Sequence, residues 1–157
     1  MKTATCIFSS NVLSYNPCFH TQGIVSMIKH IGSTHVFVHD QDRAKAFFLD
    51  KVGFELVSDQ PMFPGTPNRW LSVRPKGAVT ELVLLVIDEQ SERFRPLIGT
   101  EQGIIFEVDD LMAEVERLRA NGVEISQEPS LHPWGGMAWF KDSEGNQYML
   151  HQKPQQG

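Results

Sequence analysis

Hydrophobic and polar residues alternate over residues 31–38, which is the period of a β-strand. The two sets are Thr34, Val36 and Val38 on one face and Ser33, His35 and Phe37 on the other. The valine-bearing face is the more apolar, so we expect it to pack against a helix. His35 and Phe37 are then expected on the opposite face of the sheet.

A helix is predicted directly after this strand. Asp40 and Asp42 can cap its N-terminus. Apolar residues follow at helical spacing, namely Ala44, Phe47, Phe48 and Val52. Gly53 is expected to end the helix in a left-handed conformation. Three strands are predicted next, in the segments FELVSD, RWLSVRP and ELVLLVI, with a Pro/Gly-rich loop after the first.

The same order recurs in the second half of the chain. The segment GIIFEVDD is a predicted strand, and a helical apolar stripe follows it, formed by Leu111, Val115 and Leu118. The segments VEIS, MAWFKD and QYMLHQ are predicted strands, and DSEGN is the turn before the last. Val38 and Gly53 are fifteen positions apart, while Val108 and Gly122 are fourteen. A duplicated βαβββ unit is predicted, although α+β chains also show strand–helix–strand order twice by coincidence.

Composition indicates a globular protein with a sizeable core. The 157 residues are 41% apolar and 21% charged, and the net charge is −5. This acidic balance disfavours nucleic acid and anionic membranes as partners. The longest apolar run, residues 82–87, is far shorter than the roughly 20 residues that span a bilayer. The two cysteines, Cys6 and Cys18, lie at the N-terminus, so we expect no disulfide scaffold and a cytoplasmic location.

The N-terminal 26 residues show neither helical nor strand periodicity. Polar residues interrupt their apolar stretch, which disfavours a signal peptide. We predict that residues 1–26 are a disordered extension. Residues 27–153 are expected to form a single domain, with module one at about 28–89 and module two at about 102–152, and residues 154–157 a tail.

Two segments within this repeat, VHDQDRAKAFFLDKVGFELV and FKDSEGNQYMLHQ, resemble the vicinal oxygen chelate superfamily. This superfamily includes glyoxalase I, extradiol dioxygenases and bleomycin-resistance proteins, and the resemblance covers about residues 28–152. It implies an α+β fold in which two βαβββ modules form a concave mixed sheet, with the helices on the outer face. It also implies a homodimer, in which the concave surface is often completed by the partner.

The resemblance also locates four metal-ligand positions, which metal-using members fill with histidines and acids. By position they fall on Ser33, Leu84, Gly103 and Met149, with Leu85 as the other register for the second. None of these side chains suits zinc, nickel, iron or manganese. We therefore expect neither the usual metal site nor a cofactor.

A displaced divalent-metal site is the alternative. His35 and His151 each lie two residues beyond a ligand position, on the expected face, and Glu107 shares the face of Gly103. Histidines that line a pocket more often bind an organic ligand, a carboxylate or water. His30 and His39 lie outside the strand and are expected to be solvated.

Aromatic residues cluster in the strands and loops expected to line the concave face. Trp134 lies in a Pro/Gly-containing loop and could stack on a planar ligand, or it could fill the core or the dimer interface with Trp139. Arg69 could bind an anionic group, or it could lie on the surface. The full set of expected ligand-binding residues is His35, Phe37, Arg69, Trp70, Glu107, Trp134, Trp139, Met149 and His151.

Three functions are consistent with these patterns. The first is a metal-free protein that binds an aromatic or apolar organic ligand, as the drug-sequestering resistance proteins do. The second is an enzyme of lyase, isomerase or dioxygenase type, with Glu107 as candidate general base beside His35 and His151. The third is a protein whose concave surface has collapsed and whose role is assembly.

Overall fold

The computed structural model describes residues 26–65 and 68–154. Apart from Ser26 and Pro154, the predicted N-terminal extension and C-terminal tail lie outside these residues. Among the described residues, we find no helix with the length and apolar character needed to cross a membrane.

The first half of the chain forms module one. Its elements are β1 (Ser33–Val38), α1 (Gln41–Ala46), the π-helix η1 (Phe47–Val52), β2 (Glu55–Pro61), β3 (Arg69–Arg74) and β4 (Glu81–Val86). A short 3₁₀ helix, η2 (Glu92–Leu97), then leads to module two. The elements of module two are β5 (Glu101–Glu107), α2 (Leu111–Ala120), β6 (Glu124–His132), β7 (Gly135–Lys141) and β8 (Gln147–Gln152).

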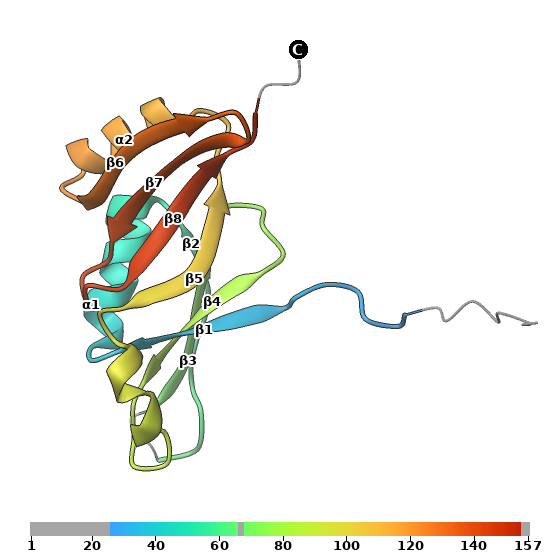
Figure 1. Ribbon diagram of the computed structural model, residues 1–157. Helices are drawn as coiled ribbons and strands as arrows, with labels where there is room; N and C mark the ends of the chain where they lie inside the picture. The colour runs from blue at the N-terminus through green and yellow to red at the C-terminus, as the bar shows by residue number, and fades with distance from the viewer. Residues whose placement is uncertain (1–25, 66–67, 155–157) are drawn as a thin grey trace, which may run out of the picture.

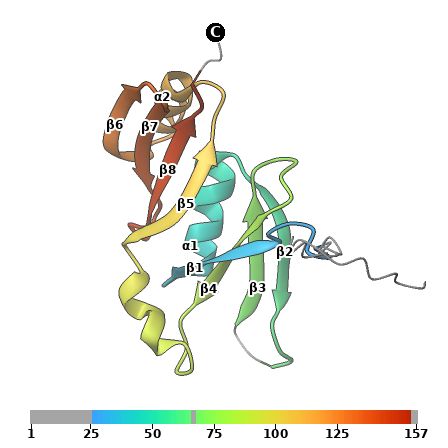
Figure 2. The same cartoon turned by 45° about the vertical axis from the view of Figure 1, so that its right-hand side comes forward.

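The predicted βαβββ duplication is confirmed, because each module forms its own four-stranded mixed sheet. The strand orders are β1-β4-β3-β2 and β5-β8-β7-β6. In each sheet the first and last strands of the module are parallel neighbours, and the other pairs are antiparallel. Thus β1 and β5 are edge strands, each with one edge that pairs with no strand of the described chain (Figure 2).

The helices begin where the sequence predicts. The Asp40 side chain accepts hydrogen bonds from the backbone N–H groups of Asp42 and Arg43, and Asp110 accepts one from Ala113. Gly53 ends the first helix with a positive φ of 87°, as expected. The extra residue between Val38 and Gly53 is absorbed by the π-helix, because each π turn holds one residue more than an α turn.

The predicted strand faces are confirmed. Val36 and Val38 of β1 have no exposed surface, and Tyr148 and Leu150 of β8 are buried as well. Ser33 and His35 are exposed on the opposite face. The helix α1 packs on β3 and β4, and α2 packs on β6, β7 and β8, so one face of each sheet is covered.

One hydrophobic core joins the two modules. The Phe48 ring lies 5.8 Å from the Tyr148 ring, and the Phe54 ring lies 5.5 Å from the Phe106 ring, in each case centroid to centroid. Phe140 stacks on Tyr148 at 5.3 Å. The first helix therefore lies between the two sheets in Figure 1 and is covered by both.

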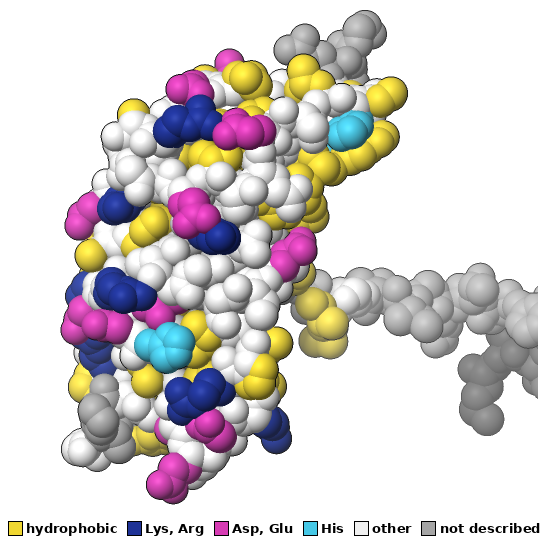
Figure 3. Space-filling model, turned by 60° about the vertical axis from the view of Figure 1, so that its left-hand side comes forward, with side chains coloured by type: hydrophobic (Ala, Val, Ile, Leu, Met, Phe, Trp, Pro, Cys, Tyr) yellow, Lys and Arg dark blue, Asp and Glu magenta, His cyan; other side chains and the backbone are white. Residues whose placement is uncertain are grey.

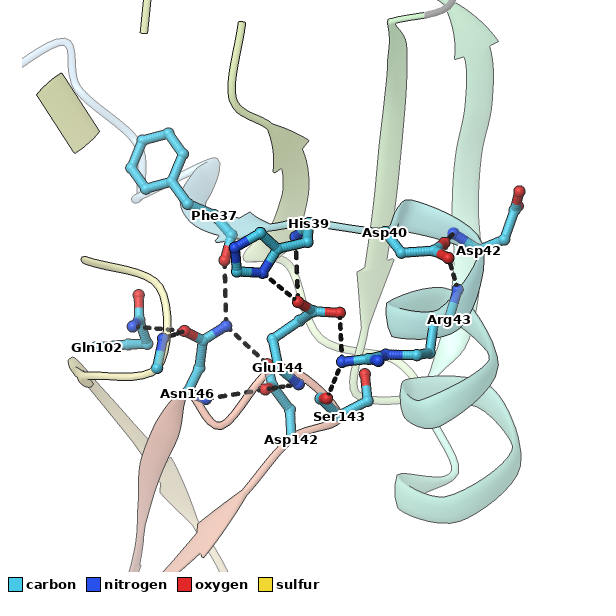
Figure 4. A network of polar contacts seen from close by, with 11 residues as sticks. Phe37, His39, Asp40, Asp42, Arg43, Gln102, Asp142, Ser143, Glu144 and Asn146 are labelled. Carbon is cyan, nitrogen blue, oxygen red and sulfur yellow. Dashed lines mark hydrogen bonds and ion pairs between the residues drawn. The ribbon is translucent and has the colours of Figure 1, made fainter. Parts of the chain in front are cut away.

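A polar network ties the DSEGN turn of module two to the start of α1 (Figure 4). Glu144, with a side chain only 1% exposed, contacts His39 Nδ1 at 2.8 Å and Arg43 at 2.9 Å. Buried Asn146 donates to the Phe37 carbonyl and accepts from Gly99 N–H. His39, expected to be solvated, is thus half-exposed and bonded to Glu144.

Asp142 anchors this turn from inside the core. Its carboxylate accepts hydrogen bonds from the backbone N–H groups of Glu144 and Asn146, from the Asn146 side chain and from the Tyr148 hydroxyl. Burial raises the pKa of Asp142 above its ordinary value, and these hydrogen bonds oppose the shift. Burial and the neighbouring Asp142 also raise the pKa of Tyr148 well above its ordinary value.

Candidate functional site

The candidate site consists of the sheet faces that carry no helix, which we call the helix-free faces. Their positions alternate with the buried residues of each strand. Module one presents Ser33, His35, Phe37, Trp70 and Ser72 on this face, and module two presents Ile105, Glu107, Met137, Trp139, Met149 and His151. On the opposite, helical side, charged groups of both signs lie next to one another (Figure 3).

In module one, aromatic rings line the helix-free face. His35 and Trp70 meet edge to face, with ring centroids 6.3 Å apart, and Trp70 is 39% exposed. Phe37 stacks on Phe94 of η2 at 4.9 Å, and the Arg93 guanidinium lies 4.7 Å from the centre of the Phe94 ring. The face is therefore mainly apolar, and the His35 imidazole and the Arg93 guanidinium are its polar groups near these rings.

In module two, the corresponding face carries a wider set of groups. Trp139 pairs with Met149 across β7 and β8, and Met137 pairs with His151. Ile105 lies beside Met149 and is 55% exposed. Thioether, indole and aliphatic groups thus form a soft apolar surface that can adapt to a ligand.

Two buried polar atoms on these faces have no hydrogen-bond partner among the described residues. They are the Trp139 Nε1 atom and the Ser72 Oγ atom. A buried N–H or O–H group without a partner costs free energy. A ligand oxygen that reached either atom would recover part of that cost.

The turn between β6 and β7 presents the third tryptophan. Trp134 is 54% exposed and stacks in parallel on His132, with ring centroids 4.7 Å apart. The next residue, Gly135, has a φ of 135°, and a Cβ there would lie 2.7 Å from His151 Nε2. Glycine is therefore required for this turn to approach β8 so closely.

Arg69 lies on the helical side of the sheet and not on the helix-free face, contrary to our expectation. Its guanidinium contacts Asp42 of α1 at 2.8 Å and Asp59 of β2 at 3.3 Å. The hydrogen bond from Arg69 lowers the pKa of Asp42. Adjacent strand residues point to opposite faces, so Arg69 and Trp70 cannot both contact one ligand on this face.

Glu107 lies on β5, an edge strand of its sheet. Its side chain is 61% exposed and contacts Lys153 at 2.8 Å. It is therefore neither buried nor unpaired. In the register of β5 and β8 it is the neighbour of His151.

The register of the sheets corrects one metal-ligand position. Met149 of β8 pairs with Ile105 of β5, and the pair at the same place in module one is His35 with Val83. The second position is therefore Val83, which is fully buried, whereas Leu84 points to the other face and belongs to the hydrophobic core. The set becomes Ser33, Val83, Gly103 and Met149, whose side chains do not fit a divalent transition metal.

The displaced metal site is not assembled within residues 26–65 and 68–154, where no three His, Cys, Asp or Glu side chains gather closely enough to hold an ion. Glu107 and His151 are neighbours, but His35 belongs to the other sheet. In the enzyme hypothesis, the candidate general base Glu107 is likewise on a different sheet from His35.

Sequence reasoning missed Phe94, Met137 and Ile105 on these faces. Met137 and Ile105 could have been found by alternation, since they lie two residues from Trp139 and Glu107. Phe94 lies in the aperiodic linker between the modules, where no pattern indicates the direction of a side chain.

Comparison with known proteins adds a family match and several relatives. The model of the Glyoxalase/Bleomycin resistance protein/Dioxygenase superfamily matches residues 28–150. The chain is 40% identical over 126 residues to YetH of Bacillus subtilis (strain 168), which covers 79% of this chain and 98% of that protein. It is 32% identical to YurT of the same organism over 125 residues, 76% of this chain and 96% of YurT.

Solved structures share both fold and sequence with the chain. TnmS3, described as an antibiotic binding protein from Streptomyces sp. CB03234, is 38% identical with a TM-score of 0.70, over 83% of this chain and all of TnmS3. UcmS2 is 36% identical with a TM-score of 0.68, over 80% of this chain and 98% of UcmS2. A superfamily member from Sphaerobacter thermophilus DSM 20745 is 30% identical with a TM-score of 0.72, over 82% of this chain and all of that one.

Proposed function

The chain belongs to the Glyoxalase/Bleomycin resistance protein/Dioxygenase superfamily, and we propose that it binds an aromatic or apolar organic ligand on its helix-free faces without a metal. The observation that carries the proposal is the content of those faces. Trp70, Trp139 and Met149 lie there, and serine, valine, glycine and methionine take the places of metal ligands. The likeness to TnmS3, which is described as antibiotic-binding, supports an organic ligand.

The ligand is expected to be planar and to carry a hydrogen-bond acceptor. Flat rings can stack on the exposed Trp70 and Trp134 side chains. An acceptor oxygen would satisfy the buried Trp139 N–H group, which lacks a partner in the described chain. Shape and one hydrogen bond together would then select the ligand.

We propose that the binding unit is a homodimer in the cytoplasm. In the described chain, β1 and β5 each leave one strand edge unpaired, and the helix-free faces belong to two separate sheets. A second copy could place its β5 beside β1 and so join two such faces into one concave surface. The absence of cysteine from residues 27–157 fits a reducing compartment.

The test is a titration of EDTA-treated protein with a panel of aromatic antibiotics, followed by isothermal calorimetry and tryptophan fluorescence. We expect saturable binding by at least one compound and a loss of about tenfold or more in affinity in Trp70→Ala, because its exposed ring is removed. Met112→Ala, an exposed apolar residue of α2, is the matched control and should bind normally. Equal affinity of the two variants would contradict the proposal.

The enzyme hypothesis stays a separate prediction. No contact in the described chain gives Glu107 the desolvated setting that a general base at neutral pH usually has. Turnover of any substrate that is abolished by Glu107→Gln, with folding intact, would favour it over simple binding.

A further inference from the structure

A second cavity lies on the other side of the sheets, between the two modules. It has a volume of about 710 Å³, within the range of small-molecule sites, and it is bounded by α2, the end of β5 and the loop between β3 and β4. Apolar side chains line it, chiefly Phe54, Phe106, Phe140, Leu118 and Leu150. These residues belong to the helical side. Ile105 and Glu107, at the edge of the cavity, also lie on the helix-free face of module two, so the cavity opens on the other side of the sheets but shares these two residues with that face.

The internal duplication explains why this cavity, at about 710 Å³, is larger than the cavity of about 380 Å³ at the related junction, which Arg43, Asp142 and Ser143 line. Its counterpart is the junction where the DSEGN turn meets α1, and there Glu144 contacts Arg43. Counting from the capping residues Asp40 and Asp110, Ala113 takes the place of Arg43. Counting back from β4 and β8, Ala78 takes the place of Glu144. Both alanines line the cavity, so a small side chain on each wall replaces an ion pair.

The rim of the cavity is acidic. Four carboxylate residues line it, namely Glu107, Asp109, Asp110 and Glu114. Arg117 is the one basic residue in the lining, and it is bonded to Glu114 at 2.6 Å. Glu107 contacts Lys153. Asp109 and Asp110 are exposed and form no ion pair within the described chain, so the rim carries negative charge that no described cation balances.

We propose that this cavity is a second ligand site, which binds an apolar organic cation. An aromatic or aliphatic body would cover the exposed part of Phe106, and an ammonium group would lie at the rim near Asp109. Burial of the apolar body supplies affinity, and the carboxylates select for positive charge. The ligand expected here is therefore a cation, whereas the ligand proposed for the helix-free faces is aromatic or apolar with a hydrogen-bond acceptor.

The experiment compares two probes that differ in charge. The full chain is titrated by calorimetry with 1-naphthylmethylamine, which is cationic at neutral pH, and with 1-naphthalenemethanol, its neutral analogue. We expect the amine to bind at least about fivefold more tightly, because one carboxylate–ammonium contact at a partly exposed rim adds about 1 kcal/mol. Asp109→Asn should remove this preference without weakening the alcohol, and Glu116→Gln, a charge outside the cavity, should preserve it.

Variants that fill the cavity test its location. Ala113→Trp should abolish the preference for the amine, and Ala78→Phe, on the opposite wall, should do the same if the first variant folds poorly. Circular dichroism reports on folding of both. Trp70→Ala should leave the preference for the amine intact, because Trp70 lies on a helix-free face. A chain lacking residues 1–32 should bind the amine as the full chain does.

Several outcomes would overturn the proposal. Equal affinity for amine and alcohol would remove the role of the acidic rim. A preference for the amine that survives in folded Ala113→Trp, or that disappears in Trp70→Ala, would place the amine elsewhere. Tighter binding after removal of residues 1–32 would show that this segment, with its exposed Met27, Ile28 and Ile31, occupies the cavity instead. Both probes are planar and also fit the ligand class proposed for the helix-free faces, so the ratio of amine to alcohol affinity is measured in Trp70→Ala as well. A ratio that persists there belongs to the cavity, whether or not antibiotics bind the helix-free faces.

Discussion

The two junctions between the modules are related by the duplication, and they differ in how they are closed. At one, Glu144 and Asn146 of the DSEGN turn bond to module one. At the other, Ala78 and Thr80 occupy the corresponding turn, and a cavity of about 710 Å³ is left. A smaller cavity of about 380 Å³ remains at the first junction, where Arg43, Asp142 and Ser143 line it. We call the first the closed junction and the second the open junction. The backbone plan is the same in both, so the difference teaches that the side chains of one short turn influence how much open space a junction keeps.

The two junctions are also expected to contribute to different properties, one to stability and the other to ligand binding. The closed junction buries Asn146 completely and Glu144 nearly so, which makes it sensitive to substitution. The open junction exposes alanines at its walls and keeps its polar groups at the rim. We therefore expect substitutions at the closed junction to change the free energy of unfolding, and substitutions at the open junction to change ligand binding.

The largest effect is expected for Asn146→Ala. The side chain donates to Phe37 O and Asp142 and accepts from Gly99 N–H, and its loss leaves buried groups without partners. We expect the free energy of unfolding, measured by urea denaturation, to decrease by about 3 kcal/mol. Thr80→Ala at the open junction is the matched control and should lose about 1 kcal/mol or less, because Thr80 makes one side-chain hydrogen bond, to Ile31 O. Equal losses would contradict the asymmetry.

Glu144→Gln is expected to lower the free energy of unfolding by about 1–2 kcal/mol. It removes the charge that faces Arg43 and His39, but those partners are 58% and 60% exposed, which limits the energy at stake. Arg43→Met should give a similar loss, and the double variant should lose less than the sum of the two. Additive losses in this double-mutant cycle would show that the pair does not act as a unit.

The ion pair can also be transplanted. Ala113→Arg combined with Ala78→Glu should close the open junction, abolish the preference for 1-naphthylmethylamine and stabilise the protein by at most about 1 kcal/mol, since the new pair is partly exposed. Each single variant is the control for the double. If the double variant bound the amine as before, the correspondence between the two junctions would be wrong.

The smallest effect concerns pH and Asp142. Burial raises the pKa of Asp142 above its ordinary value of 3.8, so the native state holds this proton more tightly than the unfolded chain. The resulting stabilisation is complete below 3.8 and is lost as the pH rises through the native pKa. The free energy of unfolding of the wild type minus that of Asp142→Asn should therefore fall with rising pH. A difference that rises with pH would contradict the direction of the shift.

Much of the fold could be predicted because strand and helix periods encode which face of each element is buried. Val36, Val38 and Tyr148 fell on the predicted faces for this reason. The spacing of fifteen against fourteen residues was visible in the sequence, but its cause, a π-helix before Gly53, required the structure.

The site was less predictable. Arg69 was expected with Trp70 among the ligand-binding residues because its charge suggested an anionic ligand. Alternation places these neighbours on opposite faces, and Arg69 pairs with Asp42. The second metal-ligand position was predicted at Leu84 and lies at Val83, because the sequence of either strand alone does not determine the register of β1 against β4. The cavity at Ala78 and Ala113 could not have been predicted, because it arises from two small side chains that are distant in sequence.

The central claim is that the helix-free faces bind an organic ligand without a metal. The most direct measurement is native mass spectrometry of the protein after EDTA treatment, with an aromatic antibiotic added and with nickel or zinc returned in a parallel sample. We predict a protein–antibiotic complex of equal abundance in both samples, with no metal retained, and a weaker complex for Trp70→Ala. A stoichiometric metal that is needed for the complex, and that is lost in His35→Ala or His151→Ala, would contradict the claim.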